Sequence, residues 1–531
     1  MRRASATAAR GGDDHDALIV GSGATGSWMA KELTGHGLRV LLLEAGPKVS
    51  WQAPAEPERG GGRRWASRKP VQATCWACSE QTERFFVDDG EAPYDLSSRA
   101  PFLWIRGRQV GGRTLVWSRQ CYRLSDWQLH AASQDGHGED WPLSHRELSP
   151  YYARVERFIG VTGRRDGLQH VPDGAFLPPR RPGRAALRVQ EQLAKGLPHR
   201  TAIVARLASE DRPSKRCPSC GKAGECDGFP FFTSPGSTLH AALATGRLTV
   251  RPDSIASHVV VSRRSGRARG CAFVDRISGR SFEARARVVV LCASTIESAR
   301  LLLNSDGLED ESGQLGCNLM DHTYGVKLLG TLPAQRGDGG PRQSLLYIPW
   351  PHSGAASPHG FLRGYGVQMT VYQPDPAERP RRPVLVNMQA FGEMLPRPEN
   401  RVTLARQRDA YGIPLPRVRC AHSDNEVRMA KHQVGALEEI ASAAGVKVAG
   451  VSKALMAPGS AIHEVGTARM GRDRRRSVLD PWNRAWGIRN LYVVDGSCFP
   501  SIGFQNPTLT MMALAARAGD HIAAGMRRRE L

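Results

Sequence analysis

The first regular pattern of apolar and polar positions lies between residues 16 and 46. Residues 17–20 (ALIV) and 38–46 (LRVLLLEAG) are nearly continuous apolar runs, the kind that strands of a buried parallel sheet use. Between them, GSGATG has the composition of a turn, and residues 27–37 have helical spacing and end at two glycines. The pattern therefore predicts a strand–turn–helix–strand unit at the start of the chain.

Further along, the pattern changes in character several times. Residues 50–100 are rich in Pro, Gly, Arg and Trp without periodicity, which predicts an extended loop or lid, and residues 164–235 read as irregular. Residues 140–163 contain a capped amphipathic helix. Strand-like runs return at 246–275 and 283–294, and a helix follows at 295–305. Residues 326–454 alternate strand-like runs with a helix near 425–444, which suits a separate antiparallel sheet.

Together these segments predict an α/β protein with a Rossmann-like domain and a second, antiparallel-sheet substrate domain. A chain of 531 residues is longer than one core usually supports, so more than one domain is expected. We assign residues 1–150, 236–325 and 455–531 to the Rossmann-like domain, residues 151–235 to a substrate or cap region, and residues 326–454 to the substrate-binding domain.

Composition and charge narrow the class of protein. With 40% hydrophobic and 23% charged residues the composition is that of a globular protein. The formal net charge of +22 invites a nucleic-acid interpretation, but the basic residues are mostly Arg, are spread along the chain, and accompany no nucleic-acid-binding motif. We favour an arginine-rich composition with no nucleic-acid partner, although a basic surface could steer an acidic partner protein or an anionic substrate.

The same sequence bears on compartment. No apolar run is long enough for a membrane span, and the N-terminal leader lacks the apolar segment of a secretory signal. The eleven cysteines are unevenly spaced, which favours a reduced, cytoplasmic protein over a disulfide framework. Export together with a signal-bearing partner stays open.

Gly21, Gly23 and Gly26 form G-x-G-x-x-G between the first predicted strand and helix. The first glycine permits the tight turn, the second lets a pyrophosphate approach the backbone, and the third lets helix and strand pack closely. Glu44 ends the second strand, where a carboxylate accepts hydrogen bonds from an adenosine ribose. A glycine-rich turn with a surface glutamate would explain neither the spacing nor the strands, so we predict a dinucleotide site.

The dinucleotide is predicted to be FAD, because the unit stands at the extreme N-terminus of a long chain and its second strand ends in Glu-Ala-Gly. A second flavin-like stretch runs from residue 106 to 127. There the Gly111–Gly112 pair would let the backbone lie against an isoalloxazine edge, and Trp117 would supply a flat neighbour. The alternative for Trp117 is a core aromatic.

Two late stretches hold candidates for the chemistry. Hydride transfer from an alcohol to a flavin needs a base for the hydroxyl proton and a second group that holds the oxygen. His463, in SAIHEVGTARMG, and Asn506, in GFQNPTLT, suit these roles, each on a loop fixed by Gly or Pro. Asp495 and Gly496 end a buried strand, a good place for a flavin ribityl or phosphate contact. Taken alone, His463 could also be a core histidine with satisfied hydrogen bonds.

With these motifs the chain resembles the glucose-methanol-choline (GMC) flavoprotein oxidoreductases. The resemblance covers residues 15–325 and 455–525 through VGSGATG, Glu44, VGGRTLVW, HEVGTARMG and LYVVDGSCFPSIGFQNPTLTMMALAARAGDHI. It implies the GMC fold, His463 as catalytic base, Asn506 as its partner, and Ile255 and Thr508 at the cofactor. Within the family the chain is most similar to bacterial sugar dehydrogenases and pyranose oxidases.

Two departures from these relatives matter. Pyranose oxidases carry a flavin-linking histidine where this chain has Val116, so we expect non-covalent FAD. Related dehydrogenases carry a fuller cysteine cluster, of which Cys217, Cys220 and Cys226 remain, and Ala223 stands at a plausible fourth position. Three thiolates, with Cys75 or Cys78 as a fourth, could hold an iron–sulfur cluster. We favour the alternative, unligated thiols on a loop.

The predicted function is oxidation of a secondary alcohol of a sugar or glycoside to a ketone, by hydride transfer to flavin N5. The electrons would leave to a quinone or cytochrome acceptor, with a small subunit as a candidate partner. One alternative is a pyranose-oxidase-like enzyme that uses oxygen, makes hydrogen peroxide and tailors a natural-product sugar. Another is a flavin-binding partner subunit without turnover.

Overall fold

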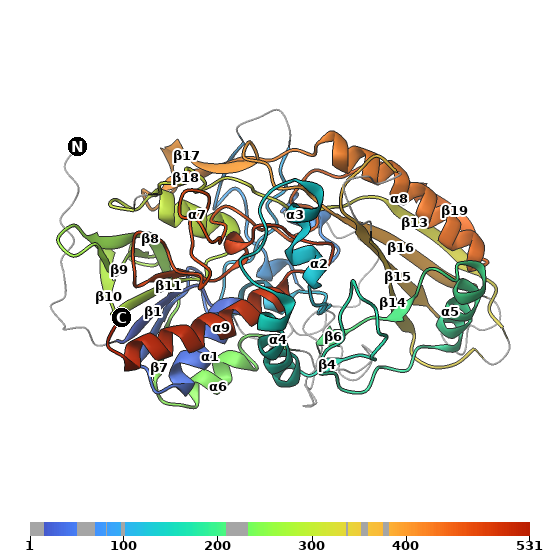
Figure 1. Cartoon of the computed structure of the whole chain (residues 1–531), viewed down its shortest axis with the longest axis horizontal. Helices are drawn as coiled ribbons and strands as arrows, with labels where there is room; N and C mark the ends of the chain where they lie inside the picture. Colours follow the sequence, from blue (N-terminus) through green and yellow to red (C-terminus); the bar gives the residue numbers. More distant parts are fainter. Residues whose placement is uncertain are drawn as a thin grey trace, which may run out of the picture.

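The computed structural model of the chain describes residues 15–49, 69–80, 82–96, 101–208, 232–308, 310–335, 338–351, 359–374 and 382–531. Two large sheets organise them (Figure 1). A parallel sheet with helices α1 and α9 lies at one end of the molecule, and an antiparallel sheet with helix α8 lies at the other. The predicted fold class, a Rossmann-like domain joined to an antiparallel-sheet domain, is confirmed.

The parallel sheet gathers strands from three distant parts of the chain. Its order is β20-β11-β1-β2-β7, and every neighbouring pair is parallel. The strands are β1 (Ala17–Val20), β2 (Val40–Leu43), β7 (Leu248–Arg251), β11 (Val288–Leu291) and β20 (Leu491–Val493). β1, β11 and β20 are buried at every position, which explains their continuous apolar sequences.

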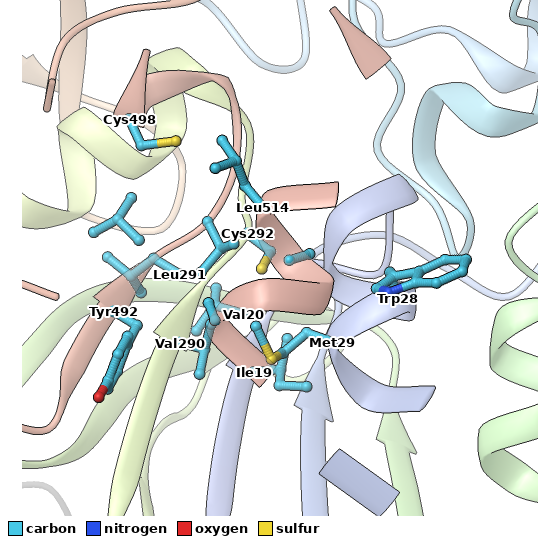
Figure 2. Close-up of a cluster of buried hydrophobic side chains, with 14 of the residues drawn as sticks. Ile19, Val20, Trp28, Met29, Val290, Leu291, Cys292, Tyr492, Cys498 and Leu514 are labelled. Carbon is cyan, nitrogen blue, oxygen red and sulfur yellow. The ribbon is translucent and has the colours of Figure 1, made fainter. Parts of the chain in front are cut away.

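Helices α1 (Ala24–Gly35) and α9 (Thr508–Arg527) pack against each other beside this sheet. Figure 2 shows Met29 of α1 and Leu514 of α9 beside side chains of the strands, with Trp28 of α1 to the right of this group. These three residues are fully buried. The predicted helix in residues 140–163 is α4 (His145–Ile159), which packs on α9 and starts at a capping box formed by Ser144 and Glu147.

The antiparallel sheet has the order β19-β13-β16-β15-β14-β5, and β12 pairs with the end of β16. Helix α8 (Asp424–Ala443) covers one face of it. On β16, Val386, Met388 and Ala390 pack in the core beneath α8, so Asn387, Gln389 and Phe391 project from the opposite face. The strands are β5 (Ile203–Val204), β12 (His322–Thr323), β13 (Lys327–Leu332), β14 (Gln343–Trp350), β15 (Tyr365–Tyr372), β16 (Val384–Glu393) and β19 (Lys447–Ser452).

Smaller elements complete the described part of the chain. An antiparallel three-stranded sheet is built by β8, β9 and β10, a second small sheet by β17, β18 and β3, and a two-stranded pair by β4 and β6. Their bounds, with the remaining helices, are β3 (Asp95–Leu96), β4 (Val161–Thr162), β6 (Leu207–Ala208), β8 (Ser254–Ser262), β9 (Arg267–Asp275), β10 (Ser281–Arg285), β17 (Arg401–Arg408), β18 (Pro414–Arg419), α2 (Asp126–Leu129), α3 (Ala131–Asp135), α6 (Thr238–Leu243) and α7 (Thr295–Leu303).

The prediction of an irregular segment across residues 164–235 is wrong in part, because helix α5 (Arg184–Gly196) and the short strands β5 and β6 lie within it. Ala185, Ala186, Val189 and Leu193 form the buried stripe of α5, and this stripe packs in the same core as α8. The Pro- and Arg-rich flanks obscured a helical spacing that tertiary packing then stabilises. No helix in the described ranges is long and apolar enough to cross a membrane.

Replacing Leu514 by Ala should destabilise the protein by about 2–5 kcal/mol, because a buried leucine leaves both a transfer cost and a cavity. Leu514 is 0% exposed in α9, whereas Leu187 in α5 is 42% exposed. Leu187→Ala is the matched control and should change the free energy of unfolding by at most about 0.5 kcal/mol. Urea unfolding midpoints measure both, and equal shifts would contradict the core described here.

Candidate active site

One cavity of about 280 Å³ lies where the strands of the parallel sheet end. Its wall includes residues that directly follow β1, β2, β11 and β20, as expected for a ligand site in an open parallel sheet. Most of the residues predicted to bind a cofactor or act in catalysis line it: Gly21, Gly23, Glu44, Gly112, Trp117, Ile255, His463, Asp495, Gly496, Asn506 and Thr508. Gly26 and Gly111 are not in the wall and act through packing.

The glycine turn between β1 and α1 has the geometry that the motif predicts. Gly21 has φ +99°, and a Cβ on Gly26 would lie 1.9 Å from the Gly21 carbonyl oxygen, so only glycine permits this approach of helix to strand. A Cβ on Gly23 would meet nothing within 4 Å, so the space beside this backbone is open. α1 begins at Ala24 with no side-chain cap and no acidic residue in its first turn. Free N–H groups and the helix dipole suit a pyrophosphate.

Glu44 directly follows β2, the strand beside β1, and contacts the glycine turn. Its carboxylate accepts hydrogen bonds from the Ser22 N–H at 3.0 Å, the Ser22 hydroxyl at 2.5 Å and the Gly46 N–H at 3.0 Å. Burial raises the pKa of Glu44, while these donors act in the opposite direction. A carboxylate has about four acceptor sites, so it can still accept a bond from a ribose hydroxyl.

The second glycine pair lies against the first. Gly111 and Gly112 both have positive φ, and a Cβ on Gly112 would lie 3.3 Å from the Gly23 Cα. The Gly111 N–H donates to the Ser22 hydroxyl at 2.9 Å, which ties the two turns together. Trp117 lines the cavity, and its Nε1–H donates to the Phe232 carbonyl at 3.0 Å. An open backbone cradle, an uncapped helix start and a carboxylate at the end of the neighbouring strand fit a dinucleotide such as FAD.

Asp495 lines the cavity, but both oxygens of its carboxylate already accept hydrogen bonds from groups of the protein. Ser497 donates to one oxygen through its N–H at 3.0 Å and its hydroxyl at 2.5 Å. The Ser294 N–H at 3.0 Å and the Ser298 hydroxyl at 2.5 Å donate to the other. Burial raises the pKa of Asp495. Its clearest role is to join the loops after β11 and β20, and Gly496 and Thr508 line the cavity beside it.

His463 and Asn506 lie together in the wall of the cavity. Asn506 Nδ2 lies 3.2 Å from His463 Nε2, and the other ring nitrogen, His463 Nδ1, lies 3.0 Å from Nδ1 of His322. His322 Nε2 in turn lies 3.0 Å from the Gly503 carbonyl oxygen. Burial, and then His322 and Arg113, hold the pKa of His463 well below its usual value, and burial lowers the pKa of His322 to about 4. Both imidazoles are therefore neutral near pH 7.

The loop that carries His463 is held by a buried carboxylate. Asp321 accepts N–H bonds from Gly459 at 2.8 Å, Ala461 at 3.1 Å and His463 at 3.0 Å. Burial raises the pKa of Asp321 to about 7. Ile462 has φ +63°, a region that β-branched residues rarely adopt, so these three bonds maintain a strained backbone directly before His463.

Sequence reasoning did not assign roles to Asp321, His322 or the pair of Arg113 with Glu464. Arg113 Nη1 lies 2.7 Å from Glu464 Oε2 across the cavity, and Glu464 is 1% exposed. The available signal was the adjacent Asp-His in the apolar stretch NLMDH, since two adjacent buried ionisable residues need specific partners. Nothing in the local sequence indicates which partners those are.

The predicted cysteine cluster, Cys217, Cys220 and Cys226, lies outside the described residues. Cys75 and Cys78, the suggested additional ligands, are buried in an apolar cluster with Phe85, Phe86 and Leu115. Burial raises the pKa of both thiols, that of Cys78 to about 11. The eight cysteines in the described ranges are all buried and free.

Comparison with known proteins shows which family the chain matches. Two family models described as GMC oxidoreductase match the chain, one over residues 15–324 and the other over residues 396–515. These ranges contain the glycine turn, Glu44, His463 and Asn506.

Individual relatives cover almost the whole chain at low identity. 2-Methyl-1,2-propanediol dehydrogenase of Mycolicibacterium austroafricanum is 29% identical over 96% of this chain and 95% of its own length. The fructose dehydrogenase large subunit of Gluconobacter japonicus is 27% identical over 96% of this chain and 97% of its own. The crystal structure of pyridoxine 4-oxidase from Mesorbium loti shares the fold, with a TM-score of 0.62 and 19% identity over 96% of this chain and 99% of that chain.

Replacing Gly23 by Ala should lower FAD retention without unfolding the protein. The new methyl group would stand in the open space beside the turn, and Gly23 has φ −66°, which alanine tolerates. Gly35→Ala, in the same helix with nothing within 4 Å of a Cβ, is the matched control and should keep the wild-type flavin content. Flavin absorbance per chain after gel filtration, with the melting temperature of the apoprotein, measures both effects. Equal flavin content in the two variants would place the cofactor elsewhere.

Proposed function

We propose a specific reaction for this chain, which belongs to the glucose-methanol-choline (GMC) oxidoreductase family and is therefore an enzyme that oxidises an alcohol with FAD. The proposed donor is a secondary alcohol of a sugar or glycoside, and the proposed product is the ketone. The electrons pass on to an external quinone or cytochrome acceptor. His463 is the proposed base and Asn506 the group that holds the donor oxygen.

The observation that carries this assignment is the hydrogen-bond chain from Gly503 to Asn506. The Gly503 carbonyl can only accept, so His322 Nε2 carries a proton and donates to it. Neutral His322 then has a free lone pair on Nδ1, and His463 Nδ1–H must donate to it. Neutral His463 is left with an unprotonated Nε2, next to the Asn506 amide. The chain thus selects the tautomer that a base at Nε2 requires.

In the proposed reaction His463 Nε2 takes the proton of the donor hydroxyl. In the free protein the Asn506 Nδ2–H group lies beside His463 Nε2. In the proposed reaction it donates to the oxygen of the alcohol and holds that oxygen beside Nε2. FAD, when bound, would supply the acceptor for the hydride that leaves the carbon bearing this hydroxyl. Asp321 is buried and accepts the backbone N–H of His463, so it holds the loop that carries the proposed base.

We propose that FAD is bound non-covalently, because Val116 cannot form a bond to the flavin. Val116 lines the cavity at the position where pyranose oxidases carry the flavin-linking histidine, and its side chain has no group that could form such a bond. Release of intact FAD on denaturation would support this proposal.

The donor and acceptor classes rest on the relatives and on polar groups near the base. Two relatives are named for small polyhydroxylated donors, a diol and a sugar, and one is named as the large subunit of its enzyme. A small partner subunit or a cytochrome is accordingly the proposed route for the electrons.

The flavin of the purified protein should bleach under anaerobic conditions on addition of a sugar or glycoside that is its donor. His463→Asn should retain the flavin bands and lose bleaching by about 10³-fold in rate, because the base is absent. Reoxidation in air, compared with reoxidation by a soluble quinone, then identifies the acceptor. A flavin that stays oxidised with every sugar and glycoside would overturn the proposed donor class.

Replacing His322 should test the tautomer chain. His322→Leu removes the acceptor for His463 Nδ1–H and should lower kcat by about 10²-fold, the scale of a misplaced catalytic group. His322→Gln keeps an amide oxygen to accept from His463 and an amide N–H to donate to Gly503, so it should recover most of that loss. Equal losses in both variants would contradict the tautomer role.

The pH profile of the wild type gives a further readout of the same chain. Because the pKa of His463 is lowered, the base stays unprotonated below the pH at which a free imidazole gains its proton. The acidic limb of kcat/KM should therefore lie below pH 6.5, and a limb at or above the ordinary imidazole value of about 6.5 would contradict it.

A further inference from the structure

A row of polar side chains crosses the face of the antiparallel sheet that α8 does not cover. Lys327 on β13 is directly opposite Gln389 on β16, and Gln389 is opposite Gln368 on β15. We call these three residues the polar row. Their strand neighbours Leu328, Met388 and Val367 are in the core beneath α8, so the polar row projects from the other face.

This face leads directly to the proposed base. Phe391 is two residues beyond Gln389 on the same face of β16, and its ring centre is 6.0 Å from that of His463. At the other end of the row, Tyr347 on β14 is opposite Gln368, and its hydroxyl donates to the Phe504 carbonyl at 3.2 Å. Two residues along a strand span roughly 7 Å, about the length of a sugar ring. The polar row therefore lies about one sugar ring beyond the side chain that contacts His463.

Two amide atoms on this face lack a hydrogen-bond partner in the described part of the protein. Gln389 Nε2 is a buried atom without a hydrogen-bond partner. So is Oδ1 of Asn387, which lies two residues before Gln389 on the same face of β16. Lys327 Nζ lies 4.6 Å from the centre of the Tyr324 ring and forms no ion pair with any carboxylate of the described residues. Buried polar groups are normally paired, so unpaired amides beside an active site point to a ligand that supplies the missing bonds.

We infer that the polar row binds the part of the donor that lies away from the oxidised carbon, and that a carboxylate is its preferred group there. The inference rests on the proposed function, because it takes a sugar donor whose reacting hydroxyl is at His463. Amides can both donate to and accept from hydroxyl groups, which suits a polyhydroxylated ring. The ammonium group of Lys327 only donates, and it forms stronger bonds to an anion than to a neutral oxygen.

The charge of the sugar determines the order in which donors are expected to bind at the polar row. A sugar acid or its glycoside gains a charge-assisted bond to Lys327, a neutral sugar gains an ordinary hydrogen bond, and an amino sugar meets a like charge. The net charge of +22 acts in the same direction at longer range, because a basic protein attracts anionic donors and repels cationic ones.

Three matched glycosides test this order: methyl glucoside, its C6 carboxylate (methyl glucuronoside) and its 6-amino-6-deoxy form. In the wild type, KM should be lowest for the carboxylate, about 10-fold higher for the neutral glycoside, and higher again for the amine, as expected when a charge-assisted bond replaces a neutral one. Lys327→Met keeps the length of the side chain without its charge and should bring the three KM values to within about 2-fold.

Two more variants separate the row from its surroundings. Gln389→Leu should raise KM for all three glycosides without changing their order, because it removes bonds to hydroxyls and not the charge. Thr331→Val lies on the same strand and face as Lys327, four residues further along, and is the matched control that should behave as the wild type. A wild-type order that survives in Lys327→Met would overturn the inference.

Binding measured without turnover separates this inference from the proposed function. The FAD-loaded His463→Asn variant, with and without Lys327→Met, is titrated with methyl glucuronoside by calorimetry. An affinity loss of about 10-fold on Lys327→Met supports the polar row even if the wild type oxidises none of the three glycosides, a result that would defeat the proposed function alone. Equal affinities in the two titrations would overturn the inference while leaving the oxidation of sugars intact.

Discussion

The parallel pairing of β1 with β11, and of β11 with β20, brings the glycine turn and the loops after β11 and β20 to one edge of the sheet. These strands come from the beginning, the middle and the end of the sequence, yet their carboxyl ends share one edge. The glycine turn, Glu44, Asp495 and the loop of Asn506 all follow from that edge. Helix α1 packs so closely on the turn after β1 that Gly26 admits no side chain. The packing of the core therefore also fixes the position of the glycine turn.

The two domains meet through hydrogen bonds at the proposed base. His322 belongs to β12, which pairs with the end of β16 in the antiparallel sheet, while His463 and Gly503 belong to loops of the FAD-binding domain. The antiparallel sheet thus includes His322, which lies in the range 236–325 assigned above to the Rossmann-like domain, and does more than cover the active site. It supplies the group that selects the tautomer of His463, and the same sheet presents the polar row about one sugar ring away.

Burial sets the electrostatics of this site. It raises the pKa values of Glu44 and Asp321 and lowers those of His322 and His463, since a low dielectric disfavours every charged form. The imidazoles are thus neutral where a base is needed, and the acids are held by N–H donors where a loop must be fixed. The same low dielectric makes an unpaired amide such as that of Gln389 costly until a donor molecule occupies the site.

The sequence by itself determined the features that depend on residues close together in the chain. The glycine turn with Glu44 and the loops of His463 and Asn506 are local patterns, because backbone geometry dictates which residues they contain. Tertiary structure alone decided that His322, 141 residues before His463, donates and accepts in its hydrogen-bond chain, and that Lys327 and Gln389 form one row. Strand pairing and register set these contacts, and single positions carry no record of a partner so distant in sequence.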